Sequence, residues 1–124
     1  MTRRLACAFV FSIALIGSAL AEERRLDADE VTAALTGDTA RGLAPGPEYL
    51  QYFDASGTTV YATRSAPPDH GRWRVDADGG YCSQWRDGAW SCYEVWAAND
   101  LIVWVSPSGT RYPARMLEGR VSSF

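Results

Sequence analysis

The sequence predicts a mainly β protein: an antiparallel up-and-down meander that forms a small barrel or a strongly curved sheet, with one short N-terminal helix. Two observations predict it. From Gly42 onward, turn-forming residues recur at short intervals, and the segments between them are strand-length and rich in Val, Ile, Thr, Trp and Tyr. Short connections between successive strands imply hairpins, and a sheet built from hairpins must curl closed or be covered.

The first residues have the order of a secretory signal peptide. Arg3 and Arg4 carry the positive charge, an uncharged run at 5–20 is dominated by apolar residues, and small residues flank a cleavage point after about Ala21. The run is shorter than the roughly 20 residues that a membrane-spanning helix needs, which favours a cleaved leader over a membrane anchor.

Cleavage there leaves a small exported chain. Residues 1–21 are expected to be the signal peptide, and residues 22–124 suffice for a single β domain with one modest core. Cys7 precedes the apolar run, whereas the lipid-modified cysteine of a lipoprotein follows it, so lipidation is not expected. The predicted location is periplasmic or secreted, and the mature protein is not expected to be embedded in a membrane.

The charge of the chain limits its expected partners. The formal net charge is −3, and it becomes more negative when Arg3 and Arg4 leave with the signal peptide. An acidic protein lacks the broad basic surface that phosphate backbones require, so nucleic acid is not an expected partner. Every basic residue is Arg, which we interpret first as the codon usage of a GC-rich genome and not as anion recognition.

Two cysteines remain after the signal peptide is removed. Cys82 and Cys92 are an even pair in an oxidising compartment, where disulfides form and persist. The lone His70 adds only a third potential ligand, and the spacing matches no common zinc finger, so neither a metal nor another cofactor is expected. A redox-active pair would favour a tight Cys-x-x-Cys motif or a strongly electropositive site. We therefore expect a structural disulfide.

A short helix is predicted over about 27–36. Asp27 can accept hydrogen bonds from the free backbone donors at the helix start, Glu30 completes a capping box, and Gly37 supplies the stop. The apolar residues of this segment fall on one stripe: Leu26, Val31, Ala34 and Leu35. The helix is therefore expected to lie against the rest of the domain as a lid or an edge cover.

Strands are predicted between the turn motifs, from about 49 to 116. They cover about 49–54, 58–64, 72–76, 80–86, 89–96, 101–106 and 110–116, with Thr39–Gly42 as a candidate for a short strand before them. The proline-rich stretch 67–71 is predicted to be a loop.

The hairpin between the strands at 80–86 and 89–96 has a predicted register. If residues 86–88 form a three-residue loop with Gly88 in the left-handed conformation, Trp85 faces Ala89. Pairing then continues symmetrically away from the loop.

That register places the two cysteines opposite each other. Cys82 would face Cys92 on the neighbouring strand, and the bond between them would stabilise the hairpin by about 2–3 kcal/mol through chain entropy. The disulfide is therefore an independent test of the strand assignment.

The same register divides the central hairpin into two faces, and both carry aromatic residues. One face holds Cys82, Gln84, Trp90, Cys92, Glu94 and Trp96, and the other holds Tyr81, Ser83, Trp85, Ser91, Tyr93 and Val95. Which face is core stays open. An exposed aromatic row is typical of surfaces that bind sugars, peptides or apolar ligands, and the alternative is that Trp and Tyr simply fill a narrow barrel. The candidate ligand-binding residues are Tyr81, Trp85, Trp90 and Tyr93.

Residues for catalysis are scarce. His70 has no nucleophile motif beside it, although a catalytic triad can be assembled from distant residues. A carboxylate pair, Glu94 with Asp76 or Asp100, could transfer protons, but Asp and Glu at strand ends are usually turn formers and solvated charges. No phosphate-binding loop of the Walker or dinucleotide type occurs in the sequence. No catalytic residue is therefore assigned, and the protein is not expected to be an enzyme.

Several short motifs are spread over the mature chain. They are Leu35-Thr36-Gly37 followed by Thr39, Gly71-x-Trp73-Arg74-Val75, Cys82-x-x-Trp85 and Cys92-Tyr93-x-Val95. As a set they resemble a family of small exported bacterial proteins known only as a domain of unknown function. The resemblance implies an envelope or secreted location in a Gram-negative bacterium, and it transfers no functional residue.

These observations predict a non-enzymatic exported β domain that binds a small ligand, a glycan or an envelope protein through an aromatic face or the mouth of the barrel. The alternative is an inhibitor or accessory protein of an envelope enzyme, in which the loop Ser65–Gly71 inserts into the partner. A third alternative is a small hydrolase, which requires an acid–base cluster around His70.

Overall fold

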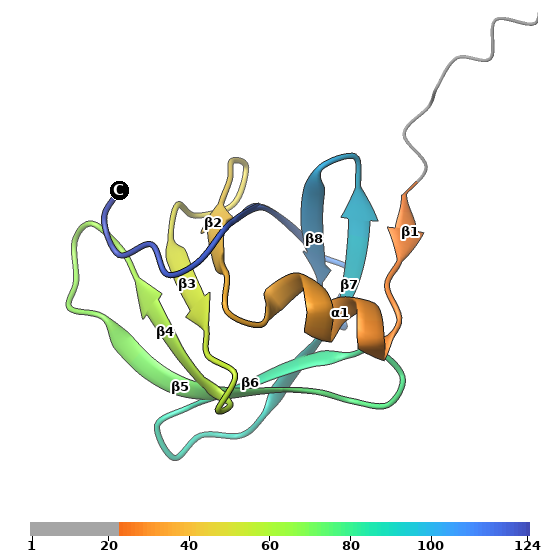
Figure 1. The fold of residues 1–124 in the computed structure, drawn as a ribbon, viewed down its shortest axis with the longest axis horizontal. Helices are drawn as coiled ribbons and strands as arrows, with labels where there is room; N and C mark the ends of the chain where they lie inside the picture. Colours follow the sequence, from red (N-terminus) through yellow and green to blue (C-terminus); the bar gives the residue numbers. More distant parts are fainter. Residues whose placement is uncertain (1–22) are drawn as a thin grey trace, which may run out of the picture.

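The chain folds into a closed antiparallel barrel in a computed structural model that describes residues 23–124 (Figure 1). Its eight strands are β2 (Thr39–Gly42), β3 (Leu50–Phe53), β4 (Thr58–Ala62), β5 (Asp69–Val75), β6 (Tyr81–Trp85), β7 (Ser91–Ala98), β8 (Leu101–Val105) and β9 (Arg111–Leu117). Each strand pairs with the next, and β9 returns to pair with β2, so the meander closes on itself. This confirms the up-and-down topology and selects the barrel over the open sheet.

The predicted signal peptide at 1–21, with Cys7, lies outside the described residues. Within 23–124, no helix is long and apolar enough to cross a membrane.

One strand was not predicted. β1 (Arg24–Arg25) pairs with Trp96 and Ala97 of β7, at a point where the other edge of β7 already pairs with β8. The ladder between β6 and β7 covers only Ser91–Tyr93 on the β7 side, so β1 occupies the edge of β7 that β6 leaves free. Two residues are too few for a sequence pattern, and their strand conformation depends on this distant edge.

The predicted helix forms as α1 (Ala28–Leu35), and it lies across one end of the barrel (Figure 1). Asp27 and Glu30 form the expected capping box: the Asp27 carboxylate accepts from the Glu30 backbone at 2.9 Å, and the Glu30 side chain accepts in return. Val31 and Leu35 are fully buried within the core cluster that includes Phe53 and Val95. Each buried side chain of this size stabilises the fold by about 1.5–3 kcal/mol, so α1 covers this end of the barrel as part of the hydrophobic core.

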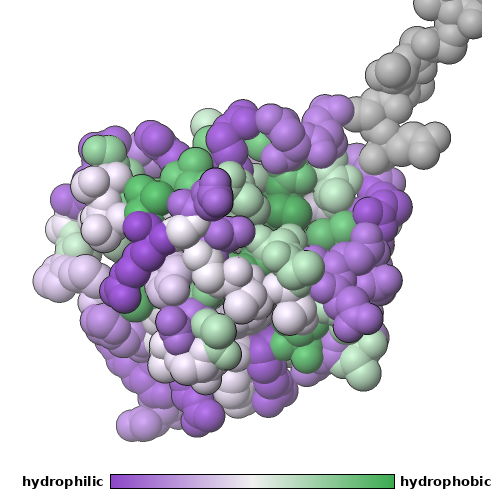
Figure 2. Space-filling view, viewed as in Figure 1, coloured by the Kyte–Doolittle hydropathy of each residue, from purple (hydrophilic) through white to green (hydrophobic). Residues whose placement is uncertain are grey.

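Polar side chains cover the outline of the molecule. Seen from the side of α1, hydrophilic residues follow the edges, and less polar residues lie toward the middle (Figure 2).

The register of the central hairpin and the disulfide are confirmed. Tyr81 pairs with Tyr93, and Cys82 pairs with Cys92, to which its sulfur is bonded. The cysteines lie on the outer face, whereas Tyr81 belongs to the core cluster and Tyr93 packs against it. The face that carries Tyr81, Ser83, Trp85, Tyr93 and Val95 is therefore the interior of the barrel.

The turn of this hairpin differs from the prediction. Arg86, and not Gly88, takes the left-handed backbone conformation, with φ of 56°. The Gly88 amide donates to the Trp85 carbonyl at 3.1 Å, so the chain reverses one residue earlier than expected. β7 consequently begins at Ser91 instead of 89, and no Trp85–Ala89 pair extends the ladder.

The proline-rich connection is shorter than predicted. Residues 69–71 pair with β4 and belong to β5, so three of the seven residues of the proposed inserting loop Ser65–Gly71 are strand. Gly71 is tolerated there because the Trp85 indole fills the space that a side chain would take: a Cβ on Gly71 would lie 2.6 Å from Trp85 Cε3. The stretch that contains Gly71 was predicted to be a loop. Gly71 is nevertheless part of a strand, because the aromatic ring of Trp85 on the neighbouring strand packs over it.

Candidate ligand-binding site

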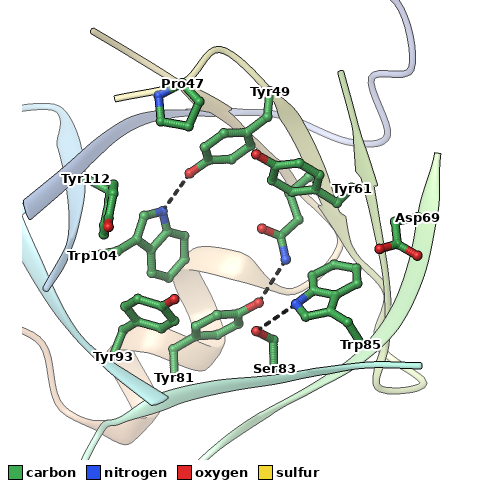
Figure 3. Close-up of a pocket in the computed structure, with 11 residues that line it drawn as sticks. Pro47, Tyr49, Tyr61, Asp69, Tyr81, Ser83, Trp85, Tyr93, Trp104 and Tyr112 are labelled. Carbon is green, nitrogen blue, oxygen red and sulfur yellow. Dashed lines mark hydrogen bonds between the residues drawn. The ribbon is translucent and has the colours of Figure 1, made fainter. Parts of the chain in front are cut away.

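A cavity of about 350 Å³ opens at the barrel end that α1 does not cover, and we call it the cup. The direction of β3 shows which end of the barrel this is. The carbonyl of its last residue, Phe53, accepts a hydrogen bond from the Gly37 amide just after α1, so the first residue of β3 lies at the barrel end away from the helix. The cup is lined by Pro47, Tyr49, Gln51, Tyr61, Asp69, Tyr81, Ser83, Trp85, Tyr93, Trp104 and Tyr112, which surround an open centre (Figure 3). All strands from β3 to β9 contribute, because alternate residues of each strand point inward.

The floor of the cup is formed by Tyr81 and Trp104. Their ring centroids are 4.8 Å apart, and Phe53 packs beneath both, with centroids 5.7 Å from Tyr81 and 6.0 Å from Trp104. The two floor residues are 4% and 5% exposed. Burial raises the pKa of the Tyr81 hydroxyl, so this group stays neutral at physiological pH.

Gln51 brings an amide to this floor in one fixed orientation. Its Nε2 donates to the Tyr81 hydroxyl at 2.8 Å and to Thr59 Oγ1 at 3.1 Å. Because the Thr59 hydroxyl donates its own proton to the Tyr52 carbonyl at 2.7 Å, Thr59 Oγ1 accepts from the amide, and the nitrogen must face it.

The oxygen of the Gln51 amide is left free. Within residues 23–124, no group donates a hydrogen bond to Gln51 Oε1, and no fully buried side-chain oxygen or nitrogen lacks a partner. This oxygen is therefore reachable by solvent, and since Gln51 is only 7% exposed and lines the cup, it faces the cup. The floor offers an incoming molecule one pre-oriented acceptor among aromatic rings.

Tyr49 and Tyr61 form one wall. Their rings stack at a centroid distance of 4.8 Å, and the Tyr49 hydroxyl accepts a hydrogen bond from Trp104 Nε1 at 3.0 Å, which ties the wall to the floor. Gly42 makes room for this arrangement, because a Cβ there would lie 2.3 Å from the Tyr49 ring. Burial raises the pKa of Tyr49 to about 12, so its hydroxyl is also neutral.

Trp85 extends this wall beyond Tyr61, and its indole is held from three sides (Figure 3). The ring lies over Gly71, its Nε1 donates to Ser83 Oγ at 3.2 Å, and its edge meets Tyr61 in a T-shaped contact at 6.0 Å. An aromatic ring that is fixed in this way can bind a ligand with little loss of side-chain entropy.

The rim is polar but carries little charge. The hydroxyls of Tyr61, Tyr93 and Tyr112 have no hydrogen-bond partner among residues 23–124 and are open to solvent. Asp69 is the single charged side chain among residues 23–124 that lines the cup, and Arg86 lies 3.9 Å from it. Since no basic side chain lines the cup, it favours neutral or cationic molecules over anions.

Three of the four predicted ligand-binding residues meet in this site. Tyr81, Trp85 and Tyr93 line the cup. Trp90 does not: its ring lies under the Arg74 guanidinium, 4.2 Å from the centroid. The other four aromatic residues of the cup were not singled out from the sequence: Tyr49, Tyr61, Trp104 and Tyr112. Inward alternation along their own strands is the signal that could have found them, once the inner face of β6 was known.

The residues considered for acid–base catalysis do not form a cluster. Glu94 pairs with Arg25 at 3.4 Å, and Asp100 pairs with Arg115 at 2.7 Å, which lowers the pKa of Asp100 through that hydrogen bond. Asp76 lies instead beside the disulfide, 3.3 Å from Cys82 Sγ.

The histidine also lies apart from the cup. His70 is exposed and pairs with Val60 of β4. Of the residues that the structure describes, no Asp, Glu, Ser or Cys lines the groove to which His70 belongs. The acid–base cluster around His70 that the hydrolase alternative requires is therefore not found among the described residues that line this groove.

One group of residues has the composition of a metal site. Within the described residues, Asp76, Cys82 and Cys92 bring potential ligand atoms within 4.8 Å of one another. The two sulfurs are bonded to each other and therefore provide no thiolate, so the donor set does not fit zinc or another thiophilic metal.

Comparisons with known proteins identify no relative. No family model matches the chain, and no curated protein or solved structure matches it either. The resemblance to a family of exported bacterial proteins therefore stays a prediction, and the function has to be argued from the cup itself.

Proposed function

We propose that this protein is a non-enzymatic, exported binding protein that holds a small molecule in the mouth of its barrel. The observation that carries the proposal is the cup: an open cavity of about 350 Å³ in which seven aromatic rings surround one free amide oxygen that faces the cavity. Ligand sites are typically concave, mostly apolar and largely pre-formed, with a few polar groups that fix orientation, and a volume of this size lies at the small end of their range of roughly 300–1,000 Å³.

The lining indicates the chemistry of the ligand. A flat ring can stack against Trp85 or Tyr61, and a donor group on it can reach Gln51 Oε1 at the floor. The three free tyrosine hydroxyls at the rim can bind polar groups at the outer end of the same molecule. A neutral or cationic molecule with one apolar ring face and polar ends, such as a sugar unit or an aromatic alcohol or amine, satisfies these groups together.

The disulfide supports an exported location. The Cys82–Cys92 bond forms and persists in an oxidising compartment, and the N-terminal segment has the sequence pattern of a signal peptide. We therefore propose that the mature domain acts in the periplasm or outside the cell, where a ligand-binding protein meets nutrients, cell-wall fragments and signals.

The test is a fluorescence titration of the oxidised mature protein with a phenolic alcohol, an aromatic amine, a neutral oligosaccharide and a peptidoglycan fragment. A saturable change in tryptophan emission with one class is expected. Trp85→Ala should weaken binding about tenfold or more, because one stacking surface disappears.

Trp90→Ala is the matched control. It removes one of the five tryptophans, as Trp85→Ala does, but from outside the cup, and should leave the affinity unchanged. No response to any probe, or equal losses in the two variants, would refute the cup as the binding site.

A further inference from the structure

Ion pairing separates the arginines of this protein into two groups. Ten arginines lie within residues 23–124, and seven of them have a carboxylate oxygen within 3.4 Å: Arg24, Arg25, Arg41, Arg64, Arg74, Arg111 and Arg115. The other three are Arg72, Arg86 and Arg120. Among the described residues, Arg72 and Arg120 have no carboxylate within 4.0 Å, and the highly exposed Arg86 reaches Asp69 only at 3.9 Å.

These three arginines gather in one place. A groove of about 430 Å³ on the outer face of the barrel is lined by Thr58, Thr59, Val60, His70, Gly71, Arg72, Gln84, Arg86 and Arg120. Three arginines and the histidine thus share a surface with hydroxyl and amide groups, and no acidic side chain of residues 23–124 lines it.

The fold builds the groove from distant segments. Arg72 stands on β5 between Thr58 of β4 and Gln84 of β6, with which it is paired across the strands. Arg86 follows from the turn after β6.

Arg120 comes from the C-terminal segment, which crosses the outer surface in front of β3 and β4 (Figure 1). The Gly119 amide donates to Asp38, the Val121 amide donates to Thr39 Oγ1, and the Arg120 guanidinium lies over the Tyr52 ring at 5.0 Å. Hydrogen bonds on both sides of Arg120 therefore hold its backbone against the barrel.

Three arginines that line one groove, with carboxylates only outside its lining, repel one another, and binding an anion relieves the repulsion. Guanidinium groups also present paired N–H donors that match the oxygens of carboxylate, phosphate or sulfate. We propose that this groove binds the oxyanion groups of an acidic small molecule, and that it does so independently of the cup. The spread of the three arginines over a groove of this size fits a ligand with two or more anionic groups.

The test measures binding of citrate, of pyrophosphate and of neutral glycerol to the mature protein at low salt by calorimetry. The two anions distinguish a carboxylate ligand from a phosphate ligand, and glycerol should not bind. The double variant Arg72→Gln/Arg120→Gln should lose binding of the better anion by at least about tenfold, since two charge-assisted contacts disappear. Binding should also weaken as salt is added.

A second double variant, Arg111→Gln/Arg115→Gln, is the matched control. It removes the same charge from two arginines on β9 that are already paired with carboxylates, so binding should change less than about twofold. If the groove pair fails to fold, the single variant Arg86→Gln, at a side chain that is 84% exposed, should still weaken binding severalfold. Equal losses in the groove and control variants, or binding of neither anion by the natural protein, would overturn the proposal.

Discussion

The close approach of Gly71 to Trp85 allows a quantitative prediction. A methyl group at position 71 would place Cβ 2.6 Å from Gln84 O, 2.6 Å from Trp85 Cε3 and 2.9 Å from Trp85 Cζ3. Rotation of the Trp85 ring can relieve two of these contacts but not the third, because Gln84 O belongs to the backbone of the neighbouring strand. Gly71→Ala must therefore separate β5 from β6 as well as displace the ring.

The expected cost follows from this overlap. Forcing one extra carbon into a packed site destabilises a protein by about 1–3 kcal/mol. For a domain of this size, each kcal/mol lowers the melting temperature by about 4–8 °C, so a decrease of roughly 4–24 °C is expected. Thermal unfolding followed by near-ultraviolet circular dichroism measures the decrease, and ligand binding in the cup should weaken with it because Trp85 forms part of one wall.

Gly46→Ala provides the comparison. Its Cβ would lie 3.3 Å from Leu43 O and 3.6 Å from the Tyr112 ring, at the edge of the same cup and without the severe overlap. Its melting temperature should therefore stay within a few degrees of that of the natural protein. Equal melting temperatures for Gly71→Ala and Gly46→Ala would refute the reasoning that the Trp85 ring requires a glycine beneath it.

Other features of the fold predict further outcomes. Cys82→Ser and Cys92→Ser should each lower the free energy of unfolding by about 2–3 kcal/mol in urea titrations, because each removes the same bond, and widely different losses would contradict that explanation. Asp27→Ala should cost about 1 kcal/mol by the same measurement, since it removes the N-cap of α1, and no loss would mean that the cap is unimportant. The pKa of Tyr49 is raised to about 12 from its usual 10.0, and burial also raises that of Tyr81, so these hydroxyls stabilise the fold fully below pH 10 and lose that contribution as the pH rises toward 12. Alkaline unfolding combined with ultraviolet titration of the tyrosines measures this loss, and early ionisation of all six tyrosines near pH 10 would contradict it.

Local signals in the sequence predicted most of the secondary structure. The capping box at Asp27 and Glu30 acts within four residues, so it could be recognised without any tertiary context. The pairing of Cys82 with Cys92 was also predictable, because two strands joined by a short turn have few possible registers. Even the incorrect assignment of the left-handed residue to Gly88 did not shift that register, since the ladder depends on the strands more than on the residues of the turn.

Features that depend on distant residues could not be predicted in the same way. β1 is a strand only because β7 has a free edge, and Gly71 belongs to β5 only because Trp85 fills the space above it. The cup is a further example: the hydrogen bond from Trp104 to the Tyr49 hydroxyl and the ring contact of Tyr81 with Trp104 join segments that are not neighbours in the sheet and meet across the closed barrel. Sequence spacing identified the inward residues of one hairpin and could not show that five strands, with Tyr49 just before β3, direct aromatic rings into the same cup.

The two proposed sites share a strand, and its alternation keeps them chemically apart. Asp69 of β5 lines the cup, whereas His70 and Arg72 line the outer groove. Successive residues of a strand point to opposite faces, so one short segment presents a carboxylate inward and a histidine and an arginine outward. The cup should therefore reject the anions that the groove attracts, and Arg72→Gln should leave binding in the cup unchanged. Gly71 lies between Asp69 and Arg72, lines the groove and is packed against the Trp85 ring. The substitution Gly71→Ala should therefore disturb both sites at once.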